Sequence, residues 1–221
     1  MAMPTDHEDP PDLASLPSAA AGELELRDRF TKPLRTIAGF HARAEDDGAT
    51  VRGAAVLLDA DTLELMAGEV VSLGLPGGAD RASFDALPVL LAALKALPRP
   101  PDLAFIHGHG GAHPDHAGIA TRFGVTADLP CIGVADTIVA GGGPEPHETR
   151  GAYTALRSQV RGPQIGWLLR SKPGSAPLVV SAGHRVAMAS AADLVMRFTT
   201  THRQPEPTRL AERLVARHPP S

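Results

Sequence analysis

Three short strand-like runs near the start of the chain, separated by polar turns, constrain the fold more than any other feature. They are Thr36 to Ala42, Thr50 to Leu58 and Leu63 to Leu73, with an Asp-Asp-Gly turn after the first and an Asp-Ala-Asp turn after the second. Runs joined by turns of this kind pair as neighbouring antiparallel strands. The sequence therefore predicts a three-stranded antiparallel meander.

Strand-like and helix-like segments alternate in the next part of the chain. We expect a helix from an N-cap at Ser83 to about Leu97, a buried strand at Leu103 to His107, a short helix around Gly118 to Gly124 and a buried strand at Cys131 to Val134. This alternation favours right-handed crossovers and parallel pairing. A hairpin and two closing helices are expected at Gln164 to Arg170 with Pro177 to Ser181, Ser190 to Thr199 and Thr208 to Arg217.

The predicted fold class is α/β, with a mixed five-stranded sheet, helices on its faces and an extra hairpin. In this sheet the antiparallel meander is followed by parallel strands. A chain of 221 residues is long enough for one good-sized core. Residues 1–22 are rich in Pro, Ala and acids, so they are expected to form a mobile lead-in to a single domain over 23–221.

Charge and cysteine content narrow the function classes. The formal net charge of -4 argues against tight binding to polyanions, although a local basic groove stays open. The single cysteine, Cys131, excludes an internal disulfide. No signal-peptide core and no apolar run long enough for a membrane span occurs, so we expect a cytoplasmic protein.

Histidines gather at predicted strand ends. His41 ends the first strand, His107 precedes a Gly-rich segment that carries His109 and His113, and His184 follows the last hairpin. Functional loops of such sheets lie at the carboxyl ends of strands, and imidazole is a common ligand of transition metals. The spacing HxHGGAH matches no zinc-finger or zincin motif, and a strand-end histidine is more often a packing residue, so the motif alone is weak.

Several segments resemble the endonuclease V family of deoxyinosine-specific, Mg²⁺-dependent nucleases with an RNase H-like fold. They occur in family order over roughly residues 34–217, and they are Ile37–Gly39, Pro101–Leu103, Gly108–Gly110, Ala112–Pro114, Leu129–Ala135, Arg170–Lys172, Gly183–Val186 and Pro205–Arg209. The resemblance implies the RNase H-like fold. It also implies that His41, His107 and His184 converge on one cleft, with Asp136 close by.

The resemblance also identifies the positions where this chain departs from the family. His41 and His107 stand where the family has catalytic aspartates, and Ala86, next to Asp85, stands where it has a glutamate. Asp136 replaces the family's active-site lysine, and Pro76 to Asp80 replaces the wedge that probes the lesion. Since Mg²⁺ prefers carboxylate oxygens, the family reaction is not expected in its usual form.

Three functions follow as alternatives. The first is a repurposed metal enzyme, hydrolytic or oxygen-using, that holds Zn, Fe or Mn rather than Mg through His41, His107, His184 and Asp136. Its candidate catalytic residues are His184, Asp136 and Asp85. The second alternative is a catalytically inactive module that binds nucleic acid or protein, and the third is a metal-dependent endonuclease on inosine or deoxyinosine nucleic acid with altered ligands.

Further polar residues are candidates for supporting roles. His109 and His113 could orient ligands, and Arg185 and Lys172 could contact anionic groups of a substrate. For the metal-enzyme alternative the acidic charge and the missing wedge favour a small-molecule or nucleotide-like substrate over duplex DNA. Assembly into a homo-oligomer stays open.

Overall fold

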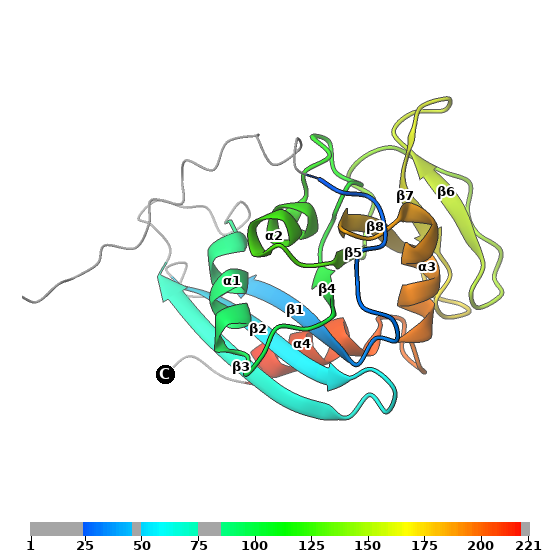
Figure 1. Ribbon diagram of the computed structural model, residues 1–221. Coiled ribbons are helices and arrows are strands. Elements are labelled where there is room, and N and C mark those ends of the chain that lie inside the picture. Colours follow the sequence, from blue (N-terminus) through cyan, green and yellow to red (C-terminus); the bar gives the residue numbers. More distant parts are fainter. Residues whose placement is uncertain (1–23, 46–49, 75–84, 218–221) are drawn as a thin grey trace, which may run out of the picture.

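The computed structural model describes residues 24–45, 50–74 and 85–217 (Figure 1). The described strands are β1 Thr36–Ala44, β2 Thr50–Asp59, β3 Leu65–Gly74, β4 Leu103–His107, β5 Cys131–Ala135, β6 Tyr153–Arg157, β7 Gln164–Leu169 and β8 Leu178–His184. The described helices are α1 Leu87–Ala96, α2 Ile119–Ala127, α3 Met188–Arg197 and α4 Glu206–Arg217. The predicted lead-in over 1–22, the Ser83 cap and the segment Pro76 to Asp80 lie outside the described residues. None of the described helices has the length and apolar character that crossing a membrane requires.

All described strands belong to one mixed sheet, in the order β3-β2-β1-β4-β5-β8-β7-β6. The β1–β2 and β2–β3 pairs are antiparallel, as the meander predicted, and the β1–β4 and β4–β5 pairs are parallel. The predicted α/β class, the meander and the parallel segment are therefore confirmed. The predicted helices are also present, with bounds shifted by a few residues.

The predicted extra hairpin is part of this sheet rather than an addition to it. Strand β8 pairs antiparallel with β5, so the sheet continues through β8 and β7 to β6. Strand β8 also extends past the predicted end at Ser181 to His184, with every residue buried. Strand β6 was not predicted, because it lies at the edge of the sheet and only Leu156 within it is buried.

Helices cover both faces of the sheet. Helices α1 and α2 pack on one face, where Leu87, Leu90 and Phe123 join Phe40 and Ile106 of β1 and β4 in one core cluster. Figure 1 shows α1 and α2 in front of the sheet and α4 behind it. The opposite face packs against α3 and α4 in two further clusters, which include Val195 and Phe198 in one and Ala211 and Val215 in the other. In such α/β sheets ligands bind at the carboxyl ends of the strands, between the two helix layers.

Helix α4 approaches β1 at Gly39. A Cβ atom at this position would lie 1.9 Å from the carbonyl oxygen of Pro207 and 2.7 Å from the amide nitrogen of Thr208. Only glycine allows two backbones to come this close. Gly39 therefore fixes where α4, and the segment that leads into it, lie over the end of β1.

We expect Gly39→Ala to destabilise the protein by about 1–3 kcal/mol, because the added methyl group must push β1 and α4 apart. The free energy of unfolding from urea titration measures the effect. Gly74→Ala is the matched control, since a Cβ there meets no described residue within 4 Å, and its effect should stay within about 0.5 kcal/mol. Equal effects of the two substitutions would contradict the close approach.

Candidate functional site at the strand ends

His41 and His107 lie side by side where the parallel pairing of β1 with β4 ends. The two strands are parallel and in register from Ile37 with Leu103 to Phe40 with Ile106, so the next residue of each strand is a histidine. The ring centroids lie 4.6 Å apart, and the ring planes are inclined by 38°. The predicted meeting of these two side chains is confirmed.

His41 is largely enclosed. Its Nδ1 atom is buried and has no hydrogen-bond partner among the described residues. Burial lowers the pKa of His41 to about 3, helped by the nearby His107 and Arg43 and opposed by Asp136. His41 is therefore a neutral imidazole at physiological pH, with one ring nitrogen unpaired.

Asp136, directly after β5, joins His107 to the segment before α4. Its Oδ2 atom lies 3.0 Å from Nε2 of His107. Its Oδ1 atom accepts hydrogen bonds from the side-chain amide of Gln204, at 2.8 Å, and from the guanidinium of Arg203. The hydrogen bond with His107 and the charges of His107 and Arg203 lower the pKa of Asp136 to about 2 against the opposing effect of burial. We refer to His41, His107, Asp136, Arg203 and Gln204 as the strand-end cluster.

Backbone carbonyl groups hold Arg203 in place. Its Nε donates to Ala176 O at 2.7 Å, and its second terminal nitrogen donates to Pro177 O at 3.0 Å and to Asp136 O at 3.2 Å. A guanidinium anchored in this way is a fixed counter-charge for the Asp136 carboxylate. Our sequence reasoning missed Arg203 and Gln204. The one signal for them is that they immediately precede Pro205, where a family-like segment begins.

The cluster lies on the face of the sheet that α4 covers. His41 pairs across β2 with Ala54, and Ala54 packs against Ala211 and Val215 of α4. Side chains alternate between the faces of a strand, so His41 points to the same side as Gly39. The start of α4 thus lies on the same face of the sheet as the two imidazoles, which stay partly exposed.

His109 borders the cluster, whereas His113 points elsewhere. The Nε2 atom of His109 lies 2.8 Å from the carbonyl oxygen of Thr137, the residue after Asp136. Burial is the main cause that lowers the pKa of His109. The ring of His113 lies 6.5 Å from that of His109, and its Nδ1 atom is hydrogen-bonded with the Asp115 carboxylate. His109 is therefore placed to fix the loop around the cluster.

The predicted convergence of His184 on this site is wrong. Strand β5 pairs with β8 antiparallel, with Cys131 opposite His184 and Ala135 opposite Val179. His184 thus lies at the amino end of β5, whereas Asp136 follows its carboxyl end. The separation along the strand is five residues, or roughly 16 Å. His184 cannot share a metal ion with His41 and His107 in this fold.

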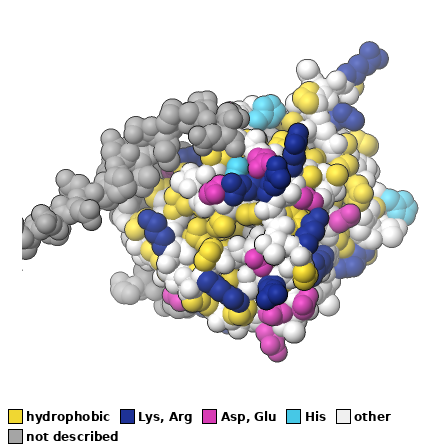
Figure 2. All heavy atoms as spheres, viewed as in Figure 1, with side chains coloured by type: hydrophobic (Ala, Val, Ile, Leu, Met, Phe, Trp, Pro, Cys, Tyr) yellow, Lys and Arg dark blue, Asp and Glu magenta, His cyan; other side chains and the backbone are white. Residues whose placement is uncertain are grey.

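The surroundings of His184 are those of a packed side chain. Its Nδ1 accepts a hydrogen bond from the Glu25 amide at 3.4 Å, and its Nε2 lies 3.9 Å from a carboxylate oxygen of Asp128. Burial lowers its pKa. Arg185 pairs with the same Asp128 at 2.6 Å, so Arg185 also lies at the amino end of β5. Figure 2 shows basic and acidic side chains gathered over this part of the surface, where Arg29 also pairs with Glu25 at 2.7 Å.

Asp85 and Lys172 also lie outside the cluster. Asp85 forms a two-pronged ion pair with Arg122 of α2, at 2.7 and 3.0 Å, and accepts the Leu87 amide hydrogen at the start of α1. Both carboxylate oxygens therefore tie α1 to α2 on the other face of the sheet, which argues against the predicted catalytic role.

Lys172 follows β7 at the same end of the sheet as Asp136 and is exposed. Its neighbour Ser171 donates a hydrogen bond to the Arg203 carbonyl at 2.6 Å.

The donor atoms of the strand-end cluster do not fit Mg²⁺. This ion prefers several hard oxygen ligands in octahedral geometry, whereas the cluster offers two imidazoles and one carboxylate. The Asp136 carboxylate is also committed to His107, Arg203 and Gln204. In the part of the chain that the structure describes, no three His, Cys, Asp or Glu side chains are arranged to hold a metal ion.

The pKa of His41 predicts a loss of stability in acid. Unfolding exposes His41 and returns its pKa to about 6.5, so the unfolded state binds a proton that the folded state excludes. Stability is therefore complete above pH 6.5 and falls as the pH drops toward 3. Between pH 6.5 and 5 the free energy of unfolding of the native protein should fall by roughly 2 kcal/mol more than that of His41→Asn. Urea unfolding at each pH measures this difference, and His202→Asn at an exposed site is the control. Identical pH profiles of stability for the native protein and His41→Asn would contradict the prediction.

Comparisons with known proteins agree with the fold and order of segments. The Endonuclease V family model matches residues 18–213. An Endonuclease V from Xanthomonas axonopodis pv. citri (strain 306) is 48% identical over 199 residues, which cover 89% of this chain and 83% of the relative.

Solved structures extend the likeness to three dimensions. The crystal structure of the Endonuclease V from Streptomyces avermitilis has a TM-score of 0.78 and 34% identity, and the match covers 90% of this chain and 87% of that one. The Endonuclease_V from Bacillus subtilis has a TM-score of 0.79 and 26% identity, with 88% and 84% covered. The predicted RNase H-like arrangement and the family resemblance are confirmed: this chain belongs to the endonuclease V family.

Proposed function

We propose that this chain is a nucleic-acid-binding member of the endonuclease V family that does not carry out Mg²⁺-dependent strand cleavage. The observation that carries the proposal is the strand-end cluster. A neutral, enclosed His41 lies beside His107, and the one carboxylate is paired with Arg203. Two-metal cleavage of a phosphodiester requires negative charge that binds the ions and stabilises the attacking and leaving oxygens. The cluster lacks that charge.

The same cluster is poorly suited to metal-free cleavage. A general base must reach the attacking water with a free lone pair, and a general acid must carry a proton at the working pH. His41 is neutral at physiological pH, and its unpaired Nδ1 atom is buried away from solvent. Nε2 of His107 faces Asp136 at 3.0 Å, so this nitrogen is already engaged. We therefore assign the cluster a binding and positioning role.

Nucleic acid is a better-supported partner than a small molecule. The chain shares its family and nearly half of its residues with a protein named Endonuclease V. Exposed Lys172 supplies positive charge after the carboxyl end of β7. Arg43 on β1 is partly exposed and pairs with Glu45 at 3.5 Å, so its charge is partly offset. Cations at this position can neutralise backbone phosphates despite the acidic balance of the whole chain.

A transition-metal enzyme is the second candidate. Because His184 lies at the other end of β5, the predicted ligand set is reduced to the imidazoles of His41 and His107 and the carboxylate of Asp136. The unpaired buried Nδ1 atom of His41 favours this candidate, and so does the carboxylate that Arg203 and Gln204 orient from outside, as outer-shell partners of a metal site do. Zn²⁺, Fe²⁺ or Mn²⁺ would suit these donors better than Mg²⁺. Metal binding would require the His107–Asp136 contact to open.

The proposal predicts binding without cleavage on a deoxyinosine-containing oligonucleotide. Fluorescence anisotropy should give saturable binding that weakens with salt and is unchanged by EDTA. With Mg²⁺ no incision should exceed that of a protein-free control. Lys172→Gln should weaken binding severalfold and reduce its salt dependence by about one phosphate contact, while Arg217→Gln at the far end of α4 serves as the matched control.

Three outcomes decide between the candidates. Mg²⁺-dependent incision that His107→Ala abolishes would overturn the proposal. Stoichiometric Zn²⁺, Fe²⁺ or Mn²⁺ in the purified protein, with a rise in unfolding temperature that His41→Ala removes, would establish the second candidate instead. Absence of both, together with EDTA-insensitive binding, supports the proposal.

A further inference from the structure

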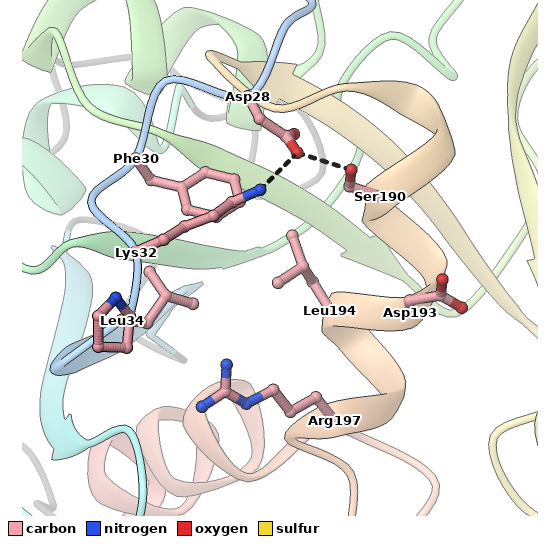
Figure 3. A pocket seen from close by; sticks show the side chains of 9 residues that line it. Asp28, Phe30, Lys32, Leu34, Ser190, Asp193, Leu194 and Arg197 are labelled. Atoms are coloured by element: carbon pink, nitrogen blue, oxygen red, sulfur yellow. Dashed lines mark hydrogen bonds and ion pairs between the residues drawn. The ribbon is translucent and has the colours of Figure 1, made fainter.

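A pocket of about 390 Å³ opens between the segment before β1 and helix α3, away from the strand-end cluster (Figure 3). Leu34 lines it two residues before β1 begins, whereas His41 lies near the other end of that strand. Seven residues of extended chain span roughly 23 Å. The pocket is therefore separate from the site discussed above, and its volume falls in the range of small-molecule sites.

The floor of the pocket is apolar. Leu34 belongs to the main core, and Phe30 and Leu194 pack against that core while staying partly accessible. Figure 3 shows the side chain of Leu194 directed from α3 toward the segment that carries Phe30 and Leu34. A ligand with a compact apolar body would bury surface against these three side chains.

Two cations, Lys32 and Arg197, border this floor. Their side chains are 68% and 45% exposed. Figure 3 shows Arg197 reaching across the pocket toward the segment before β1, while Asp193 turns away from that segment. Within the described chain, the one hydrogen bond that Arg197 makes is to Asp61, at 3.4 Å, and the Asp61 side chain is 80% exposed. Most donors of the guanidinium are thus available to a ligand.

Two acidic residues line the pocket: Asp193 is directed away from the segment before β1, and Asp28 is already hydrogen-bonded. Asp28 accepts hydrogen bonds from the Ala187 amide and the Ser190 hydroxyl, both at 2.8 Å, at the start of α3. The Lys32 ammonium lies 3.5 Å from the same carboxylate. Asp28 therefore fixes the pocket wall to α3 and offsets part of the charge of Lys32, which leaves Arg197 as the main attraction for an anion.

We propose that this pocket binds a small organic anion, a carboxylate or a phosphate ester, through an apolar body on Phe30, Leu34 and Leu194 and an oxyanion on Arg197. The planar guanidinium can donate two parallel hydrogen bonds to either anionic group. Lys32 adds a second positive charge at the edge of the pocket. This site is independent of the proposed nucleic-acid binding and would persist if that proposal failed.

Titrations with 4-phenylbutyrate and phenyl phosphate, followed by amide chemical shifts of the full-length protein, test the pocket. We expect saturable shifts confined to residues 28–34 and α3, and weaker binding of the uncharged 4-phenylbutanamide. Arg197→Gln should raise the Kd of the anions about tenfold, because it removes the charge and leaves a shorter, uncharged polar side chain. Arg213→Gln, at an exposed arginine of α4, should leave the Kd unchanged.

A second substitution separates the apolar contact from the charge. Leu194→Gln should weaken the charged and the uncharged probe alike, and the native unfolding transition of each variant shows that it is folded. The tighter of the two anions identifies the headgroup. Absence of saturable shifts in this region, or equal affinity of the native protein and Arg197→Gln for both anions, would overturn the proposal.

Discussion

The parallel pairing of β1 with β4 positions the two histidines of the candidate functional site. Its register, ending with Phe40 beside Ile106, brings His41 and His107 into contact at the carboxyl edge of the sheet. Gly39 allows α4 to close over the same edge, because any larger residue would meet the backbone of Pro207. Partial burial then lowers the pKa of His41 to about 3 and makes it a neutral imidazole that stays partly exposed. The chemical character of the site thus follows from strand register and close packing.

Charge is balanced within the strand-end cluster rather than left for a metal ion. The cluster has two imidazoles and one carboxylate, that of Asp136. This carboxylate is matched by Arg203, which three backbone carbonyls hold in place. An acid that is paired and hydrogen-bonded on both oxygens gains little by binding Mg²⁺, since the ion must first displace those partners.

Sequence patterns predicted the parts of the fold that depend on local order. The meander, the parallel strands and the helices follow from runs and turns, whereas the meeting of His41 with His107 was implied by the family resemblance. The error at His184 has a different origin. When a strand runs antiparallel to its neighbour, its carboxyl end lies beside the amino end of that neighbour. The sequence did not reveal that β8 pairs with β5 in this direction, so the position of His184 was predicted at the wrong end of β5. The role of Arg203 was not predicted, because Arg203 and Asp136 are 67 residues apart in the sequence and no local pattern links them.

The most direct test of the account asks whether Mg²⁺ reaches the strand-end imidazoles. Long-range ¹H–¹⁵N spectra report the protonation and ligation of each histidine ring nitrogen, with His41→Asn and His107→Asn providing the assignments. We predict that His41 stays neutral at pH 6 and that millimolar Mg²⁺ leaves the resonances of both rings unchanged. A saturable Mg²⁺-induced shift of both rings, lost when Asp136 is changed to Asn, would contradict the proposal that the strand-end cluster does not bind Mg²⁺.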